Sequence, residues 1–153
     1  GDAWFTSAAP KCRGMLLNPS WNDDVIVPYL GDSCAVEVYG FGGLSAAAGP
    51  AVVRLAGGDF AEAIRRTEEA RAVCLGSHDW APIPCLDFQG PPVGVDLRKA
   101  VALNLTPTSH GGTAHVDGGQ AGAGSCDLPI ECFVRGLKGF AAAHGIPTEG
   151  AAA

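Results

Sequence analysis

The sequence predicts an α/β or α+β fold in which layered strands and helices alternate and glycine-rich loops lead from strands into helices. Three observations support this prediction. Apolar residues make up 47% of the 153 residues and charged residues 17%, which suits one compact domain with a buried core. Short β-branched runs alternate with segments whose apolar residues recur at helical spacing. Glycine clusters separate several of these segments.

Residues 1–31 contain three prolines and little periodicity, so we expect an irregular lead-in with one short strand at 13–17. The core is expected over 32–145, within a single domain 1–153. The loosely alternating run 34–39 predicts its first strand, which stops at Gly40.

Glycines then lead into an alanine-rich apolar stretch, which predicts a buried helix kinked or restarted at Pro50. Asp59 and Glu62 have the spacing of a capping box at the start of the next helix, which we expect to end at Gly76. The apolar run 83–88 predicts a buried strand.

Asp96 is placed to cap a short helix that reaches about Asn104, and another strand is expected at 106–110. The glycine-rich run 118–124 is interpreted as a loop into the last helix. Ser125 or Asp127 is the expected cap of that helix, and we expect it to end at Gly145 and Pro147. One face of the helix is apolar and consists of Ile130, Phe133, Val134, Leu137 and Phe140.

The charge balance excludes a nucleic-acid partner. The net charge is −6 and the pI is near 5.0, whereas phosphate binding requires clustered cations. No stretch approaches the roughly 18 consecutive apolar residues that a membrane span needs, and no leader pattern opens the chain. We therefore expect a cytoplasmic protein without a membrane partner.

The six cysteines form no CxxC pair, so the sequence favours separate thiols over a zinc site. A disulfide framework is the less favoured alternative, because an even cysteine count in a chain of this length is weak evidence.

Two glycine clusters are candidate sites for a small anionic substrate, because they can present bare backbone N–H groups. Neither cluster matches a dinucleotide-binding or P-loop pattern. A tight turn, or close packing against neighbouring backbone, would explain the same glycines. The candidate residues are Gly42, Gly43, Gly119, Gln120, Gly122 and Gly124.

His110 and His115 are candidate catalytic residues, as general base and substrate-orienting donor near neutral pH. Asp87 is the third candidate, at the end of an expected strand. Two histidines do not complete a metal site, so we predict neither a metal nor a cofactor. Arg13, Arg54 and Arg98 are candidate anion ligands, because guanidinium groups match carboxylates and phosphates bidentately.

Several motifs, taken in order, resemble the YlbE-like family, a domain family of unassigned function that includes a subunit of oxamate carbamoyltransferase from allantoin catabolism. The resemblance covers about residues 5–140. The motifs are Gly31-Asp32-Ser33, Gly40-Phe41-Gly42-Gly43 leading through Ala48 to Pro50-Ala51-Val52-Val53, Pro84-Cys85-Leu86-Asp87-Phe88-Gln89-Gly90, Gly94-Val95-Asp96-Leu97-Arg98-Lys99, Ala114-His115 with Gly118-Gly119-Gln120, and Gly122-Ala123-Gly124 followed by Glu131-Cys132-Phe133.

The resemblance implies that the chain is the C-terminal part of a longer protein. It also implies transfer of a carbamoyl group from carbamoyl phosphate to oxamate, a reaction of nitrogen metabolism. The chain would act in an oligomeric assembly with other subunits of the enzyme. Asp32 and Asp96, which lie in matching motifs, join the candidate substrate ligands, although Asp96 also suits a helix cap. Two alternatives stay open: a non-catalytic binding or assembly subunit, and an amide or ureido hydrolase.

Overall fold

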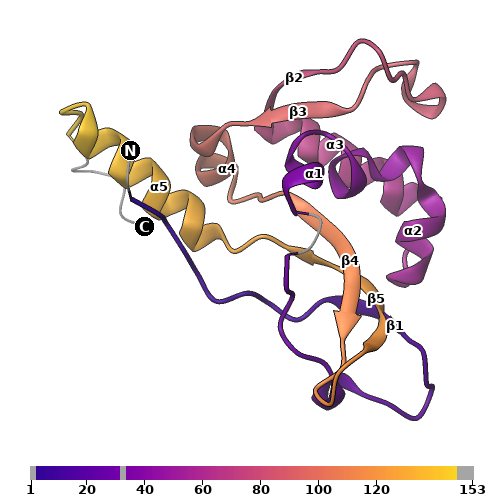
Figure 1. Ribbon diagram of the computed structural model, residues 1–153. Helices are drawn as coiled ribbons and strands as arrows, with labels where there is room; N and C mark the ends of the chain where they lie inside the picture. The colour runs from indigo at the N-terminus through magenta and orange to yellow at the C-terminus, as the bar shows by residue number, and fades with distance from the viewer. Residues whose placement is uncertain (1–2, 32–33, 148–153) are drawn as a thin grey trace.

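The computed structural model describes residues 3–31 and 34–147, which form a mixed fold of helices and two antiparallel sheets (Figure 1). The larger sheet has the strand order β1-β5-β4, with β1 at Arg13–Leu16, β4 at Thr108–Ala114 and β5 at Gln120–Asp127. The smaller sheet pairs β2 (Cys74–Ser77) with β3 (Pro92–Val95). The predicted fold class is confirmed, and the antiparallel pairings make it α+β.

The strand expected at 13–17 is confirmed as β1, and a short 3-10 helix, η1 (Asp23–Val25), follows it. The strand expected at 106–110 begins at Thr108 and continues to Ala114.

The second glycine cluster is not a loop into a helix. The chain turns at Gly118 and Gly119, which have φ angles of +97° and +79°, and returns as β5 in a hairpin with β4. The glycines of β5 lie against the backbone of β1: a Cβ on Gly122 would lie 2.0 Å from the carbonyl oxygen of Met15. Close packing between strands therefore explains why this strand is rich in glycine.

The strand expected at 34–39 is wrong, because this segment forms the short helix α1 (Cys34–Val38). Its β-branched residues favour a strand only weakly. The helix allows Glu37, which is 4% exposed, to reach two backbone N–H groups of other elements. Those buried hydrogen bonds outweigh the local strand preference.

The restart predicted at Pro50 is confirmed. A 3-10 helix, η2 (Gly42–Ala48), ends before Gly49, and Pro50 is the first residue of α2 (Pro50–Leu55). Helix α2 lies beside β5 of the larger sheet, whereas α3 packs against η2 and the two strands of the smaller sheet (Figure 1). Leu44 of η2 is fully buried against Ala70 and Cys74, and Val53 of α2 is fully buried against Ala46 and Ala63.

The capping residue of α3 (Phe60–Val73) is Asp59, as predicted, and its carboxylate accepts a 2.8 Å hydrogen bond from the Glu62 N–H. The predicted end at Gly76 is wrong. The helix ends at Val73 because Cys74 adopts extended backbone angles and begins β2.

The strand expected at 83–88 is also wrong. Pro84 has no N–H to give to a sheet, and it begins a 3-10 turn, η3 (Pro84–Leu86). Ile83 and Leu86 are both buried, since residues three apart lie on one side of such a turn. Asp87 ends the turn in a left-handed conformation with a φ of +51°.

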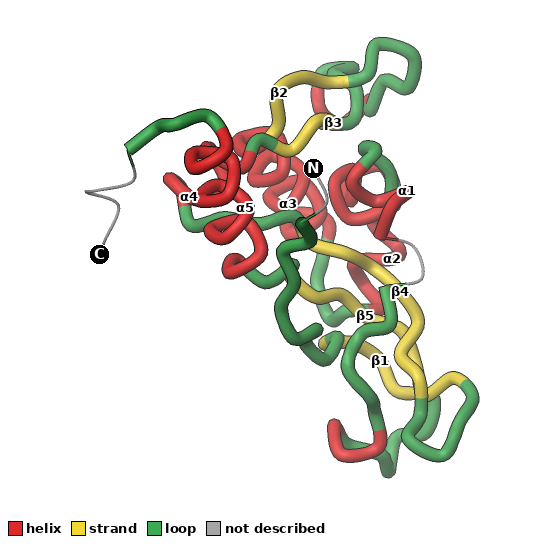
Figure 2. The backbone as a smooth tube through the Cα atoms, turned by 60° about the vertical axis from the view of Figure 1, so that its left-hand side comes forward, coloured by secondary structure: helices red, strands yellow, loops and turns green. Residues whose placement is uncertain are grey.

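The last two helices are α4 (Leu97–Leu103) and α5 (Ile130–Ala143), which lie side by side (Figure 2). Asp96 caps α4 and Asn104 ends it, as predicted.

The end of α5 before Gly145, which has a φ of +64°, is confirmed. Its predicted caps are wrong, because Ser125 and Asp127 belong to β5 and Pro129 precedes the helix. Within the described residues, no helix is both long and apolar enough to span a membrane.

Candidate functional site

Three side chains form a row across the larger sheet. In the strand register, Ser125 of β5 lies opposite Arg13 of β1 on one side and opposite His110 of β4 on the other. Directly opposite residues of antiparallel strands share a face of the sheet and lie close together. The structure therefore brings together two predicted residues, Arg13 and His110, with Ser125 between them.

Arg66 of α3 reaches this cross-strand row (Arg13, Ser125 and His110). Its Nη1 donates a 3.0 Å hydrogen bond to the Ser125 Oγ, and its Nε donates a 2.8 Å hydrogen bond to a carboxylate oxygen of Glu62. The Arg66 side chain is only 19% exposed. The guanidinium is thus held at the sheet from both sides, and its charge is poorly screened by water.

A cavity of about 330 Å³ opens beside Arg66, and we call it the basic cavity. Its lining residues are Pro10, Lys11, Arg13, Ala56, Arg66, Ser125, Cys126 and Asp127. Three of these residues are cations, namely Lys11, Arg13 and Arg66. The one carboxylate, that of Asp127, accepts a 2.6 Å hydrogen bond from the Thr108 hydroxyl. A cavity with this excess of positive charge suits an anion of small size.

The environment of His110 keeps its imidazole neutral near pH 7. Burial lowers the pKa of His110 below its ordinary value, and the positive charge of Arg66 lowers it further. His110 is buried and does not itself line the basic cavity, but it lies opposite Ser125, which does. A neutral imidazole can act as a proton acceptor.

The turn with Gly42 and Gly43 does hold an anion, and this anion is Glu37. Its two carboxylate oxygens accept hydrogen bonds of 2.7 Å from the Gly43 N–H and 2.8 Å from the His110 N–H. A Cβ on Gly42 would lie 2.7 Å from the Glu37 carboxyl carbon. These bonds tie the turn to β4 at the position of His110.

His115 and Asp87 do not line the basic cavity. His115 follows β4 at the hairpin turn, where its ring lies 4.7 Å from that of Trp21 and its Nδ1 accepts a 3.1 Å hydrogen bond from the Asp117 N–H. Five residues of extended strand separate it from His110 by about 17 Å. Asp87 is exposed at the end of η3.

Asp96 and Arg98 pair with each other instead of lining the cavity. The Arg98 guanidinium donates to both Asp96 carboxylate oxygens, at 2.6 Å from its Nη2 to Oδ2, and 72% of the Arg98 side chain is exposed. These bonds, together with the bond from the Arg98 N–H, lower the pKa of Asp96 to about 2. Asp32 lies outside the described residues.

The predicted residues of the second glycine cluster serve the hairpin. Gly119 lies in its turn, and the Gln120 side chain donates a 3.0 Å hydrogen bond to the Gly122 carbonyl. Gly124 lies beside Ser125 in the strand, where a Cβ would lie 2.4 Å from the Arg13 carbonyl oxygen.

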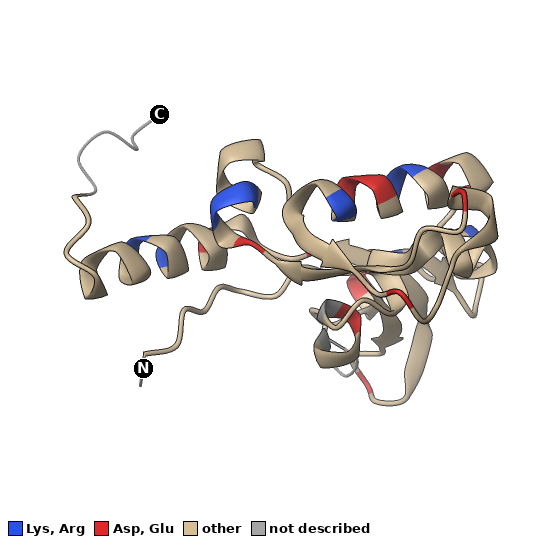
Figure 3. Ribbon diagram, turned by 90° about the horizontal axis from the view of Figure 1, so that it is seen from above, with Lys and Arg blue, Asp and Glu red and all other residues tan. Residues whose placement is uncertain are grey.

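Sequence reasoning missed Lys11, Arg66 and Ser125. Charges of both signs alternate along α3 (Figure 3), so Arg66 could not be distinguished from a residue of a solvated helix face. Ser125 was interpreted as a helix cap. Only the pairing of β5 with both neighbouring strands shows that Ser125 lies in the cross-strand row and does not cap a helix.

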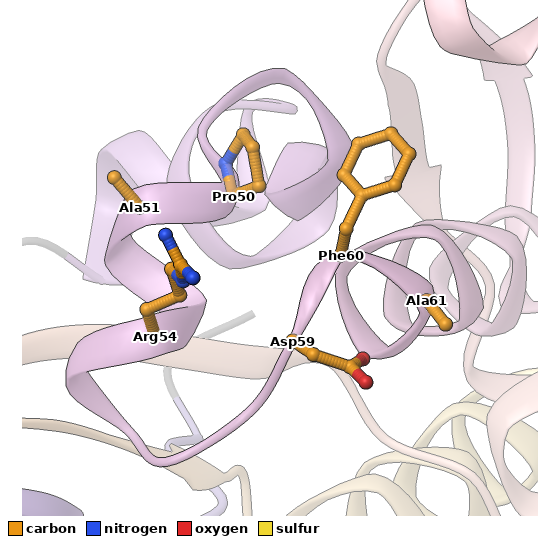
Figure 4. A pocket seen from close by; sticks show the side chains of 6 residues that line it. All are labelled: Pro50, Ala51, Arg54, Asp59, Phe60 and Ala61. Atoms are coloured by element: carbon orange, nitrogen blue, oxygen red, sulfur yellow. The ribbon is translucent and has the colours of Figure 1, made fainter.

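A second hollow of about 560 Å³ lies where α2 faces the start of α3 (Figure 4). Arg54, a predicted candidate cation, extends into it and away from the basic cavity, and the carboxylate of Asp59 already caps α3. Among the described residues, no group of three or more histidine, cysteine, aspartate and glutamate side chains could hold a metal ion.

The chain is similar to two curated proteins of Escherichia coli (strain K12). It is 34% identical over 149 residues to the oxamate carbamoyltransferase subunit AllG and 32% identical over 145 residues to the uncharacterized protein YahG. The matches cover 95% and 94% of this chain, but only 35% and 30% of those proteins. No protein-family profile matches the chain, so its place among the YlbE-like proteins stays a prediction.

A solved structure has the same fold. The crystal structure of a conserved protein of unknown function from Enterococcus faecalis V583 superposes with a TM-score of 0.86 at 33% identity, over 93% of this chain and 34% of that one. The chain thus spans about a third of the length of each relative, and it is similar over nearly its whole length to part of an oxamate carbamoyltransferase subunit.

Proposed function

We propose that this chain is part of a carbamoyltransferase-like enzyme subunit and that it binds a small anionic substrate in the basic cavity. The observation that carries the proposal is the convergence of Arg13, Arg66 and Lys11 beside His110, in a chain similar over 95% of its length to AllG. Carbamoyl phosphate and oxamate, both anions, are the proposed substrates.

The residues present suit such a transfer. The amide nitrogen of oxamate would attack the carbamoyl carbon, forming a C–N bond while the C–O bond to phosphate breaks and phosphate leaves with its electron pair. Arg13 and Arg66 would stabilise the charge on the leaving phosphate. The neutral imidazole of His110 would accept the proton that the attacking nitrogen loses.

A non-catalytic assembly subunit is the second candidate. The chain corresponds to about a third of AllG, which is named as one subunit of its enzyme, so the reacting groups could lie on other parts of an assembly. Under this alternative the basic cavity would bind no substrate.

The test is calorimetric titration of the chain with carbamoyl phosphate, oxamate and inorganic phosphate. We expect saturable binding that Arg66→Ala and Arg13→Ala each weaken by roughly 10- to 100-fold, since a hydrogen bond to a charged group contributes about 1.5–3 kcal/mol. Arg54→Ala is the matched control, because Arg54 lies in the hollow between α2 and α3, and it should leave the affinity unchanged.

Absence of binding, or equal weakening by Arg54→Ala, would contradict the site. If the anions bind, an assay with isotopically labelled water separates transfer from hydrolysis, because only a hydrolase places the label in the product.

A further inference from the structure

An apolar groove lies between α4 and α5, away from the basic cavity, and we call it the α5 groove. Its volume is about 830 Å³. Phe140 of α5 and Ile146, both lining residues, are 50% and 51% exposed. The lining residues are Arg98, Val101, Ala102, Asn104, Ile130, Val134, Leu137, Lys138, Phe140, Ala141, Ile146 and Pro147.

The residues of α5 that line this groove have the spacing of a helix-pairing seam. Ile130, Val134, Leu137 and Ala141 are separated by four, three and four residues, which corresponds to alternating d and a positions of a heptad. Glu131 and Lys138 then occupy the e positions beside the seam. Both are exposed, and neither is in an ion pair with another described residue.

The chain itself covers a different side of α5. The Phe5 ring packs on Gly139, where an added Cβ would lie 2.3 Å from the ring. The Leu97 side chain packs on Gly136, where an added Cβ would lie 3.4 Å from it. Arg135 donates a 2.7 Å hydrogen bond to the Thr6 carbonyl. Figure 1 shows the N-terminal segment along this helix, which extends away from the sheet. Within the seam, Ile130, Val134 and Leu137 are half-buried at the groove, whereas Ala141 is buried.

We propose that α5 pairs with α5 of a second copy of this chain, antiparallel, through the α5 groove. In this arrangement Val134 lies opposite Leu137 of the partner subunit. Glu131 lies beside Lys138 of the partner subunit, and the two-fold axis repeats this contact. The dimer therefore contains two such ion pairs, and each of the four charges has one partner. A parallel pair would place each e position beside a g position, where this helix has Phe133 and Phe140, and neither charge would gain a partner.

The association requires no ligand in the basic cavity, so it is independent of the proposed function. The whole of α5 has 14 residues and is about 21 Å long, which predicts a small interface and a weak dimer whose population depends on concentration.

The test is sedimentation velocity of the chain over a wide range of protein concentration. We expect a monomer–dimer equilibrium. Glu131→Lys and Lys138→Glu should each weaken it by about tenfold, because each variant replaces two attractive pairs by two repulsive ones. Both residues are exposed, so the variants should keep the fold, which circular dichroism would verify.

The double variant Glu131→Lys with Lys138→Glu restores opposite charges and should restore the wild-type dissociation constant. A wild-type chain that stays monomeric at every concentration would overturn the proposal. A dimer that the single variants do not weaken, or that the double variant does not restore, would place the contact on another surface and overturn it equally.

Discussion

His110 links the stability of the fold to pH, because its environment disfavours the charged imidazole. Burial and the charge of Arg66 lower its pKa in the folded chain below the value of about 6.5 that it has in the unfolded chain. Between these two pKa values the unfolded chain binds more protons than the folded chain. Protonation of His110 therefore favours the unfolded chain. Its effect on the free energy of unfolding is absent above about pH 6.5, and the folded chain loses stability as the pH falls through this window.

Replacing the imidazole by an amide should reduce this dependence. Thermal unfolding of the wild type and of His110→Gln, followed between about pH 7.5 and pH 5.5, should show a smaller loss of melting temperature on acidification in the variant. The other titrating groups are common to both proteins, so they cancel in the comparison. Identical slopes would mean that His110 titrates alike in the folded and unfolded chains.

Glu37 is the residue that connects the Gly43 turn to β4. Glu37→Gln replaces one of its two acceptor oxygens by an NH₂ group, which leaves a buried backbone N–H facing a donor. Urea unfolding should show a loss of about 1–3 kcal/mol. Glu68→Gln, which changes an exposed helix residue, should cost less than about 0.5 kcal/mol. Equal losses would contradict the role assigned to Glu37.

At the scale of elements, glycines determine how closely β1 can approach β5. A methyl group on Gly122 would lie 2.0 Å from the Met15 carbonyl oxygen, whereas on Gly112 of β4 its nearest neighbour would be the flexible Gln120 side chain, at 3.5 Å. We therefore expect Gly122→Ala to cost more than about 2 kcal/mol of stability and Gly112→Ala less than about 1 kcal/mol. Chemical denaturation of the two variants measures the difference, and equal stability would refute the close packing.

The helices could be predicted from the sequence better than the strands. Asp59 and Asp96 cap α3 and α4 through hydrogen bonds to residues two or three positions away, so the signal is local. The segments 34–39 and 83–88 were predicted to be strands, the first from its loose alternation and β-branched residues and the second from its apolar run. A buried carboxylate contact of Glu37 with β4 and the missing N–H of Pro84 decided otherwise.

At the scale of the whole molecule, only part of the candidate site could be predicted. Arg13 and His110 have side chains that suit anion binding and proton transfer, so residue type alone made them candidates. Their convergence depends on β5 pairing with both β1 and β4, and the contribution of Arg66 depends on α3 lying over that face. Such long-range pairing leaves no local pattern in a single sequence.

Two separate surfaces of the molecule are proposed to carry function. The basic cavity, beside the larger sheet, is proposed to bind an anion, and the α5 groove is proposed to bind a second copy of the chain. Arg66→Ala should weaken anion binding without changing sedimentation, and Lys138→Glu should do the reverse. A variant of either kind that alters both properties would show that the two surfaces are coupled.

The most direct measurement of the central claim is the titration of His110 by NMR, with and without inorganic phosphate. An anion bound at Arg66 would offset the positive charge that helps to lower the pKa of His110, so phosphate should raise this pKa. The rise should be absent in Arg66→Ala. A His110 pKa that phosphate leaves unchanged in the wild-type chain would contradict an anion site in the basic cavity.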